Sequence, residues 1–228
     1  MVRYATGAED KAARQQDILT AALDLYLQDT RRLPSVAAIA ARAGLAKGTV
    51  YLYFDSKEQI FVTLQVREWR AFIDRVNRFF RSAPGTPEQK VAGFIAQLAG
   101  HIVANPSLMR LDSMGYALLA PNLSDDRLLE FKLRFAEILE NTGHAVEEAL
   151  ALPSGKGVGL LIASFALTRG LWQIADLPAT VRSAPDFAPH PFARLELGPD
   201  LLRALTDYWR GAWRAFPAPE APDPAGFA

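Results

Sequence analysis

Between residues 31 and 57 the chain concentrates side chains that donate hydrogen bonds or carry positive charge. Five basic residues fall there against a single acidic one, Asp55. Hydroxyl, phenol and ammonium donors suit a partner rich in acceptor oxygens, such as the phosphate backbone of a nucleic acid, and a glycine lets a backbone approach it closely. We expect the contacts to come from Ser35, Lys47, Gly48, Thr49, Tyr51, Tyr53 and Lys57.

Two short helices and a tight turn would position these side chains. Ser35 can cap the first helix, and Gly44 supplies the left-handed residue that ends it. A second helix opens over residues 46–49, and along it Val50 and Phe54 are four apart and face inward. This is the layout of a helix-turn-helix, whose second helix enters the major groove of DNA.

A capped third helix follows, because Asp55 and Glu58 have the spacing of a capping box. Each residue alone also has a purely structural explanation. A glycine at a helix end is usually only a cap, and tyrosines at helical spacing more often belong to a core. The complete pattern in register is more specific than any of its parts.

The segment from residue 14 to residue 60 resembles the DNA-binding domain of the TetR family of bacterial transcriptional regulators. The matching positions are Ile39-Ala40, Ala43-Gly44, Gly48-Thr49, Tyr51, Phe54 and Ser56-Lys57-Glu58. One departure is Pro34, which precedes Ser35 where a small hydroxyl pair is common, so the phosphate contact there depends on Ser35 alone.

The candidate residues divide into two roles in such an interface. Ser35, Tyr51 and Lys57 are expected to hold phosphates, and Lys57 begins a helix, where the backbone also favours an anion. The expected contacts to base edges come from Lys47, Thr49 and Tyr53, with Gly48 allowing close approach to the groove.

Composition limits the alternatives. Half of the 228 residues are apolar, which is enough for a sizeable core, and the net charge is zero, which argues against indiscriminate coating of nucleic acid. The chain has no cysteine, so a reducing cytoplasm is the expected location. The N-terminal residues lack the apolar run of a signal peptide, and the longest apolar run, 157–168, is shorter than the roughly 20 residues of a membrane span. We therefore expect no membrane partner.

The rest of the chain shows helical spacing of apolar residues and no convincing strand, so we predict an all-α fold. Expected helices cover 10–29, 56–80, 88–103, 106–119, 124–150, 156–175 and 199–214, with a proline-punctuated interruption over 176–197. The predicted domains are an N-terminal three-helix helix-turn-helix DNA-binding domain (1–55), a larger C-terminal helical ligand-binding and dimerisation domain (56–216) and a disordered tail (217–228).

Small residues recur at three- and four-residue steps over 155–172, which would let two helices pack closely. An ordinary buried core helix is the alternative explanation. The family resemblance favours a homodimer through a four-helix bundle formed by 156–175 and 199–214 of each subunit, and a dimer can read two half-sites about 34 Å apart. The expected interface residues are Gly159, Ala163, Ala166, Tyr208, Trp209 and Trp213.

Aromatic and methionine side chains on the middle helices are usually plain core, but as a set they suggest an apolar pocket. The resemblance implies that a small effector binds there and moves the reading helices out of register. The expected pocket residues are Phe94, His101, Met109, Phe165, Arg169 and Trp172.

Signals for catalysis, metals or cofactors are weak. No histidine has a partner at metal-ligand spacing, and the glycine-rich segment 155–159 lacks the full spacing of a phosphate loop. We therefore predict a ligand-responsive transcriptional regulator, most simply a repressor released from an inverted-repeat operator by a small, largely apolar effector. A constitutive helix-turn-helix dimer, an activator and an all-α enzyme with a vestigial DNA-binding domain remain open alternatives.

Overall fold

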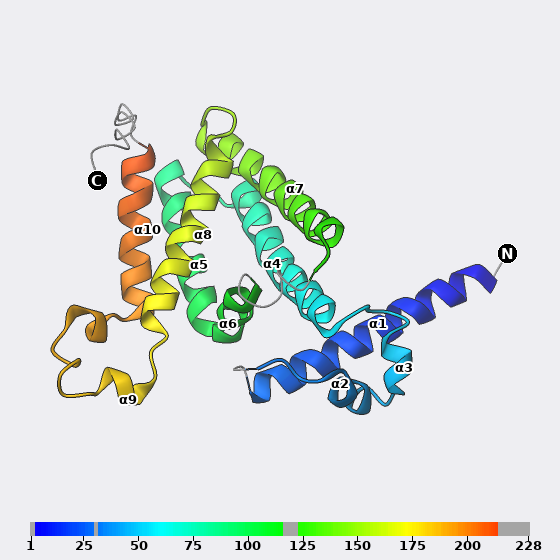
Figure 1. Cartoon of the computed structure of the whole chain (residues 1–228). Helices are drawn as coiled ribbons and strands as arrows, with labels where there is room; N and C mark the ends of the chain where they lie inside the picture. Colours follow the sequence, from blue (N-terminus) through cyan, green and yellow to red (C-terminus); the bar gives the residue numbers. More distant parts are fainter. Residues whose placement is uncertain (1–2, 30–31, 116–122, 214–228) are drawn as a thin grey trace, which may run out of the picture.

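A computed structural model describes residues 3–29, 32–115 and 123–213, in which all regular secondary structure is helical and no strand occurs. The predicted all-α fold is therefore confirmed for the described residues (Figure 1). In chain order the helices are α1 (Arg3–Gln28), α2 (Val36–Arg42), α3 (Lys47–Val50), α4 (Lys57–Ser82), α5 (Pro87–Ala104), α6 (Pro106–Met114), α7 (Asp125–Leu150), α8 (Lys156–Ala175), α9 (Ala179–Arg182), the 3-10 helix η3 (Pro191–Arg194) and α10 (Leu197–Trp213).

Most of these bounds lie close to the expected ones, with two differences. The first helix begins at Arg3 instead of residue 10. The interruption over 176–197 contains α9 and η3, and the Arg182 guanidinium holds this excursion by donating to the carbonyl groups of Ala175, Ala193 and Leu195. The predicted tail, 217–228, lies outside the described residues.

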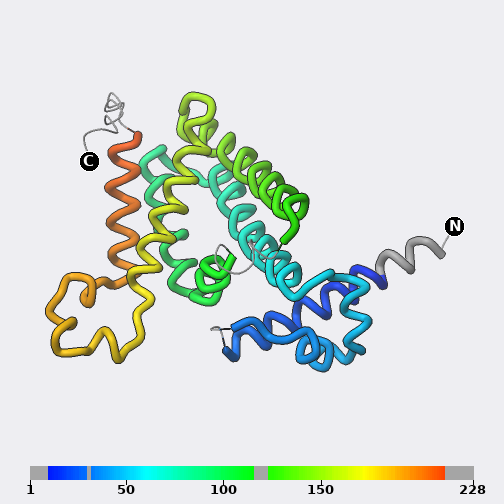
Figure 2. The backbone as a smooth tube through the Cα atoms, viewed as in Figure 1, coloured from blue at the N-terminus to red at the C-terminus, as the bar shows by residue number. Residues whose placement is uncertain are grey.

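Two apolar cores share α4. The first core joins α1, α2 and the turn after α3 to the start of α4, with Ile18, Ile39 and Phe61 all fully buried. The second core joins the rest of α4 to α5, α7, α8 and α10. The tube in Figure 2 shows α4 running from the small N-terminal group of helices into the larger bundle. A movement of α4 therefore affects both parts of the molecule.

Within the larger bundle, the last turns of α7 pack tightly against the first turn of α8. A Cβ atom at Gly157 would lie 2.2 Å from the carbonyl oxygen of Gly143, and one at Gly143 would lie 2.5 Å from Cγ2 of Val158. The backbone N–H of Gly157 donates to Glu147 Oε1 at 2.9 Å, which satisfies the start of α8. Glycine at these two positions is thus a condition for the close approach of the helices.

Candidate nucleic-acid interface and ligand cavities

The predicted turn between α2 and α3 is confirmed. Ser35 caps α2 by accepting the Ala38 N–H at 3.2 Å. Gly44 has a φ of 68°, and the N–H groups of Gly44 and Leu45 donate to the carbonyls of Ala41 and Ala40. These two bonds form a Schellman motif, which needs the left-handed residue that glycine supplies at low cost.

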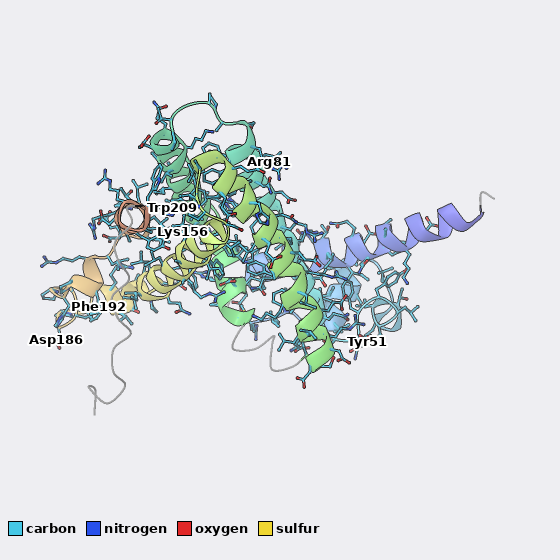
Figure 3. The ribbon with its side chains drawn as sticks, turned by 90° about the horizontal axis from the view of Figure 1, so that it is seen from above. Tyr51, Arg81, Lys156, Asp186, Phe192 and Trp209 are labelled. Atoms are coloured by element: carbon cyan, nitrogen blue, oxygen red, sulfur yellow. The ribbon has the colours of Figure 1, made fainter. Side chains whose placement is uncertain are left out.

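The α3 helix is a single turn, and the chain continues it in hydrogen-bonded turns through Phe54. Val50 and Phe54 are 1% and 2% exposed, as expected for the inward face. The opposite face exposes Lys47, Gly48 and Tyr51. Figure 3 shows Tyr51 in the N-terminal part of the molecule, far from Trp209. The buried face of this segment thus packs in the core, and the hydrogen-bond donors on its opposite face remain accessible to a partner.

The remaining candidates in this region are partly accessible. Thr49, Tyr53 and Lys57 are half-buried, and Tyr53 packs against the first core. Leu52, which sequence reasoning did not single out, is 77% exposed. Its exposure beside Tyr51 was not evident from the sequence, because an apolar residue between two tyrosines is also compatible with burial.

Capping of α4 differs from the expectation by one residue. Ser56, and not Asp55, is the N-cap, because its hydroxyl accepts the Gln59 N–H at 3.1 Å. The Gln59 side chain in turn accepts the backbone N–H of Asp55. Since Lys57 is the first residue of α4, its ammonium group lies at the helix start, 3.9 Å from Glu58.

Two small cavities lie side by side between α4, α7 and α8. The inner cavity, of about 40 Å³, is almost wholly apolar and is lined by residues that include Phe72, Phe94 and Leu161. The outer cavity, also about 40 Å³, is lined by a mixture of apolar and polar groups. Both cavities are lined by Trp69, Phe135 and Phe165, so these aromatic side chains form the wall between them.

A buried polar network forms one wall of the outer cavity. Asp112 is 1% exposed, and its carboxylate accepts from Gln65 Nε2 at 2.9 Å, Trp69 Nε1 at 3.1 Å and Arg169 Nε at 2.7 Å. Arg169 also lies over the ring of Phe165, 4.4 Å from its centroid. A buried carboxylate needs such partners, and together they fix the positions of α4, α6 and α8.

Three of the six predicted pocket residues line these cavities. Phe94 lines the inner cavity, Arg169 the outer one and Phe165 both. Met109 is fully buried in the second core. Trp172 is 6% exposed and borders a separate surface hollow near Arg110. Neither residue lines the two cavities, and the sequence pattern did not distinguish a core position from a cavity wall.

His101 also lies away from the two cavities. Its ring stacks on Phe72 with centroids 4.5 Å apart, and its Nδ1 lies 3.3 Å from Arg75 and 3.2 Å from Asn105. Burial, with a further contribution from the positive charge of Arg75, lowers the pKa of His101 below its ordinary value. The imidazole therefore packs between α4 and α5 in this structure.

Five of the six predicted interface residues lie where a partner could reach them. Gly159 and Ala166 are exposed on α8, and Ala163, Tyr208 and Trp213 are half-buried. Trp209 is the exception: it is 1% exposed in the second core, and its indole N–H donates to Ser164 at 2.9 Å. Trp209 therefore holds α10 to α8 within one protomer, which corrects its assignment as an interface anchor.

Helix α8 is unusual in being apolar but poorly covered. Among the described helices it is long and apolar enough to cross a bilayer, and 28% of its apolar stretch is buried. Helices α5 and α6 together have the length and composition of a second span, but they are bent by 82°. Core helices of soluble proteins can have the same length and apolar composition.

The described residues contain no group of three or more histidine or acidic side chains that could hold a metal ion.

These features define an all-α protein with a helix-turn-helix at one end and a cavity-bearing bundle at the other. Residues 18–64 match the family model described as bacterial regulatory proteins, tetR family, and residues 66–215 match the Tetracyclin repressor-like, C-terminal domain. The chain belongs to the TetR family.

Two curated relatives are similar over part of the chain. The fatty acid metabolism regulator protein of Bacillus subtilis is 30% identical over 39% of this chain and 45% of its own length. The HTH-type transcriptional repressor KstR of Mycolicibacterium smegmatis is 31% identical over 45% of this chain and 50% of its own. The chain thus spans about half the length of the curated relatives it matches.

Solved structures share the fold at low sequence identity. A putative TetR-family regulator from Mesorhizobium loti has a TM-score of 0.56 and 17% identity, covering 87% of this chain and 97% of its own. FadR of Thermus thermophilus, a repressor solved in complex with lauroyl-CoA, has a TM-score of 0.52 and 18% identity, covering 93% of this chain and 100% of its own.

Proposed function

We propose that this protein is a dimeric, ligand-responsive DNA-binding repressor that leaves an inverted-repeat operator when an effector enters its bundle. The helix-turn-helix carries this proposal, because the Schellman turn at Gly44 presents Lys47 and Tyr51 outward from a well-packed core. Such a surface matches the phosphates and base edges of a major groove. Relatives of this chain are transcriptional regulators, and the proposed role involves no catalysis and is exercised in the cytoplasm.

In this interface, Ser35, Tyr51 and Lys57 hold phosphates. Lys47, Thr49 and Tyr53 contact base edges, and Gly48 lets the backbone approach the groove. The phosphate contacts fix the register and contribute most of the salt dependence, whereas the base contacts discriminate between sequences. This division of roles makes the two sets separable by experiment.

Dimerisation supplies a second helix-turn-helix, which reads the second half-site of the operator. The apolar but poorly covered surface of α8 supports an interface formed with α10, because an exposed apolar face of this kind is stabilised by a protein partner. Gly159, Ala163 and Ala166 would allow close helix approach, with Tyr208 and Trp213 at the edges.

The effector is proposed to occupy the two cavities and to carry an apolar chain. The inner cavity supports an apolar occupant because its walls are almost wholly hydrocarbon. The Thermus thermophilus structure contains lauroyl-CoA, and the Bacillus subtilis relative regulates fatty acid metabolism, which supports the same kind of ligand for this chain. Because each cavity holds only about 40 Å³, such a ligand must displace side chains and helices as it enters.

Helix α6 provides a route from cavity to DNA-binding domain. Asp112 forms a wall of the outer cavity, and the preceding residue, Leu111, is 2% exposed within the first core. Adjacent residues of one rigid helix cannot move independently, so an occupant that shifts Asp112 also shifts Leu111. The proposed response is a change in the angle of the helix-turn-helix relative to the bundle.

Selection of random genomic fragments on the purified protein, read for an inverted repeat, tests the DNA-binding role. On the selected operator, Thr49→Ala is expected to cost about 1–3 kcal/mol of specific binding and to leave binding to random DNA unchanged. Lys57→Ala should weaken binding to both and lower the salt slope by about one. Equal losses on operator and random DNA for Thr49→Ala would contradict the base-contact role.

The small cavities favour one alternative, a constitutive helix-turn-helix dimer that has no effector. Thermal unfolding with and without lauroyl-CoA separates the two, because a ligand that binds only the folded state raises the unfolding midpoint. An unchanged midpoint across a series of acyl compounds would support the constitutive dimer.

A further inference from the structure

A positively charged groove lies beside the outer cavity, between α4, α7 and the end of the helix-turn-helix. We call it the arginine groove; its volume is about 420 Å³. Four guanidinium groups line it against one carboxylate, that of Glu130. Two further carboxylates, Glu68 and Asp55, pair with arginines of the groove from outside its lining, which leaves a local excess of positive charge on a chain whose net charge is zero. The four arginines are Arg67, Arg70, Arg127 and Arg134.

The arginine groove adjoins the outer cavity, which adjoins the inner one. It shares the side chains of Val62, Val66, Leu123 and Phe131 with the outer cavity, which in turn shares its aromatic walls with the inner one. Polarity therefore changes in one direction along this path. Hydrocarbon surrounds the inner end, a mixed wall follows, and guanidinium groups surround the open end.

We propose that the arginine groove binds the phosphate-bearing head group of an effector whose acyl chain lies in the inner cavity. The inference rests on the proposed function and specifies its ligand class: an acyl chain joined to a phosphorylated carrier, as distinct from a free fatty acid. One carboxylate would need a single cation, whereas four guanidinium groups match several phosphate oxygens. Arginine is suited to this role because its planar fork can bind phosphate with two parallel hydrogen bonds.

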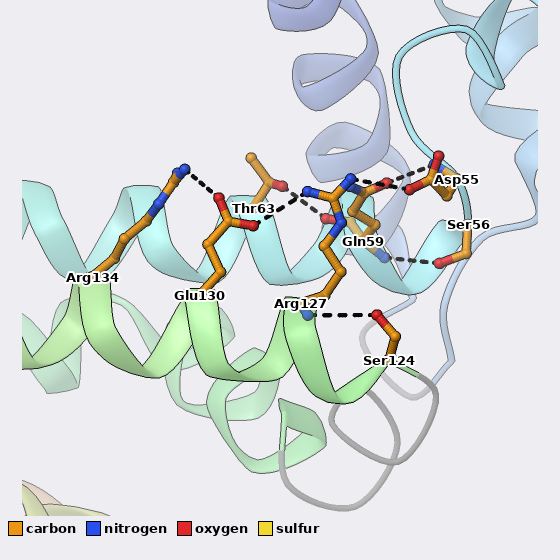
Figure 4. A network of polar contacts seen from close by, with 8 residues as sticks. All are labelled: Asp55, Ser56, Gln59, Thr63, Ser124, Arg127, Glu130 and Arg134. Carbon is orange, nitrogen blue, oxygen red and sulfur yellow. Dashed lines mark hydrogen bonds and ion pairs between the residues drawn. The ribbon is translucent and has the colours of Figure 1, made fainter.

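Three of the four guanidinium groups, those of Arg67, Arg127 and Arg134, form exposed ion pairs that a phosphate can replace. Arg127 lies 3.4 Å from Asp55 and 3.2 Å from Glu130, and Arg134 pairs with the same glutamate. Figure 4 shows this row of contacts between α4 and α7. Because these side chains are about half exposed, the existing pairs are weak, and a multiply charged phosphate is the stronger partner.

The Arg127–Asp55 pair gives head-group binding a direct consequence. Asp55 lies between Tyr53 and the cap of α4, so it belongs to the junction that sets the orientation of the helix-turn-helix. Arg127 belongs to α7, which lines both cavities. A phosphate that draws Arg127 into the groove releases this link between the bundle and the DNA-binding domain.

Isothermal titration of the full-length protein tests the proposal without DNA. The probes are lauroyl-CoA, a lysophosphatidic acid with the same acyl chain, lauric acid and CoA alone, each below its critical micelle concentration. The double variant Arg127→Ala/Arg134→Ala should lose affinity for lauroyl-CoA by about tenfold or more and keep its affinity for lauric acid. Arg203→Ala on α10 is the control, because Arg203 is 71% exposed and lines neither the cavities nor the groove.

Asp55→Asn separates head-group binding from the link to the helix-turn-helix. This variant removes the partner of Arg127 but preserves the positive charge of the groove, so its affinity for lauroyl-CoA should be unchanged or higher. An affinity loss like that of the arginine variant would show that the link, and not a phosphate contact, accounts for the effect, and would overturn the proposal. Tight binding of both the lysophosphatidic acid and lauroyl-CoA would assign recognition to the phosphate itself, whereas tight binding of lauroyl-CoA alone would assign it to the larger carrier; either result supports the groove.

Failure of the inference and failure of the proposed function have different signatures. If lauric acid and lauroyl-CoA bind equally and both release the selected operator, the protein is a ligand-responsive repressor and the groove does not read a head group. If no acyl compound binds and none releases DNA, the proposed effector is wrong. Arg127→Ala and Asp55→Asn both break the link to the helix-turn-helix, so both can lower operator affinity in the absence of ligand. If the arginine variant loses operator affinity while Asp55→Asn keeps it, the groove contacts DNA, and the head-group proposal is overturned.

Discussion

Replacement of Gly157 by alanine tests the packing that sets the position of α8. The added Cβ would lie 2.2 Å from the Gly143 carbonyl oxygen, 2.9 Å from its carbon and 3.0 Å from Cγ of Glu147. The first two atoms belong to the backbone, so no side-chain rotation relieves the contact. The two helices must separate, which also strains the hydrogen bond from the Gly157 N–H to Glu147.

The size of the effect follows from two opposing terms. Forcing an extra methyl group into a well-packed contact costs about 1–3 kcal/mol, and the upper end applies where backbone blocks the site. Alanine recovers up to about 1 kcal/mol through its higher helix propensity, and less near a helix start. The expected net loss is about 2 kcal/mol of unfolding free energy, which lowers the midpoint of a chain of this size by roughly 4–8 °C.

Thermal unfolding at a fixed protein concentration measures this loss. Gly100→Ala is the matched control, because Gly100 is exposed within α5 and its added Cβ would have no heavy atom within 4 Å outside the neighbouring helix backbone. The same substitution there should stabilise the protein by about 0.5–1 kcal/mol. If Gly157→Ala unfolds at the same temperature as the parent or above it, the close α7–α8 contact is not as described.

Two further predictions concern the dimer and the histidine between α4 and α5. The double variant Ile162→Asp/Leu202→Asp changes residues that are 51% and 43% exposed on α8 and α10, and it should convert dimers to folded monomers in sedimentation velocity. The control Leu129→Asp, at a residue 58% exposed on α7, should leave the dimer intact. A dimer that survives the double change places the interface elsewhere. Because burial lowers the pKa of folded His101, the unfolded chain binds a proton more readily, so stability should fall as the pH drops from about 8 to about 5. His101→Gln should reduce that fall in midpoint, and an identical fall in the variant would show that other groups cause it.

Local chemistry was enough to predict the helix-turn-helix in detail. Ser35 and Gly44 act through hydrogen bonds to residues within five positions, and such short-range bonds leave a clear signature in sequence. The cap of α4 shows the limit of this reasoning. Asp55 and Ser56 are both good caps at adjacent positions, and the choice between them depends on the backbone conformation, which sequence alone does not reveal.

The same reasoning failed for Trp209. Amphipathic spacing predicts that a side chain is buried, but it does not indicate whether the protein's own core or a partner subunit covers it. Trp209 and Tyr208 are neighbours on one apolar helix, and both suit an interface by composition. The structure separates them: the indole enters the second core and bonds to Ser164, and the phenol ring is half-buried. Only the packing angle between α8 and α10 decides which side chain remains available to a partner.

The buried polar network around Asp112 was still harder to predict from the sequence, because its members come from three helices. Asp112 meets Trp69, Gln65 and Arg169 at sequence separations of 43, 47 and 57 residues. In the sequence Asp112 is an isolated acidic residue on a short apolar helix, which is typical of a solvent-facing position. Its burial next to Leu111 arises because α6 is wedged between the two cores, so one face must meet the bundle while the adjacent face meets the DNA-binding domain. The residues that couple the cavities to the DNA-binding domain are therefore those that lie where the two parts of the molecule pack together. The helical pattern of a sequence does not indicate which residues pack between domains.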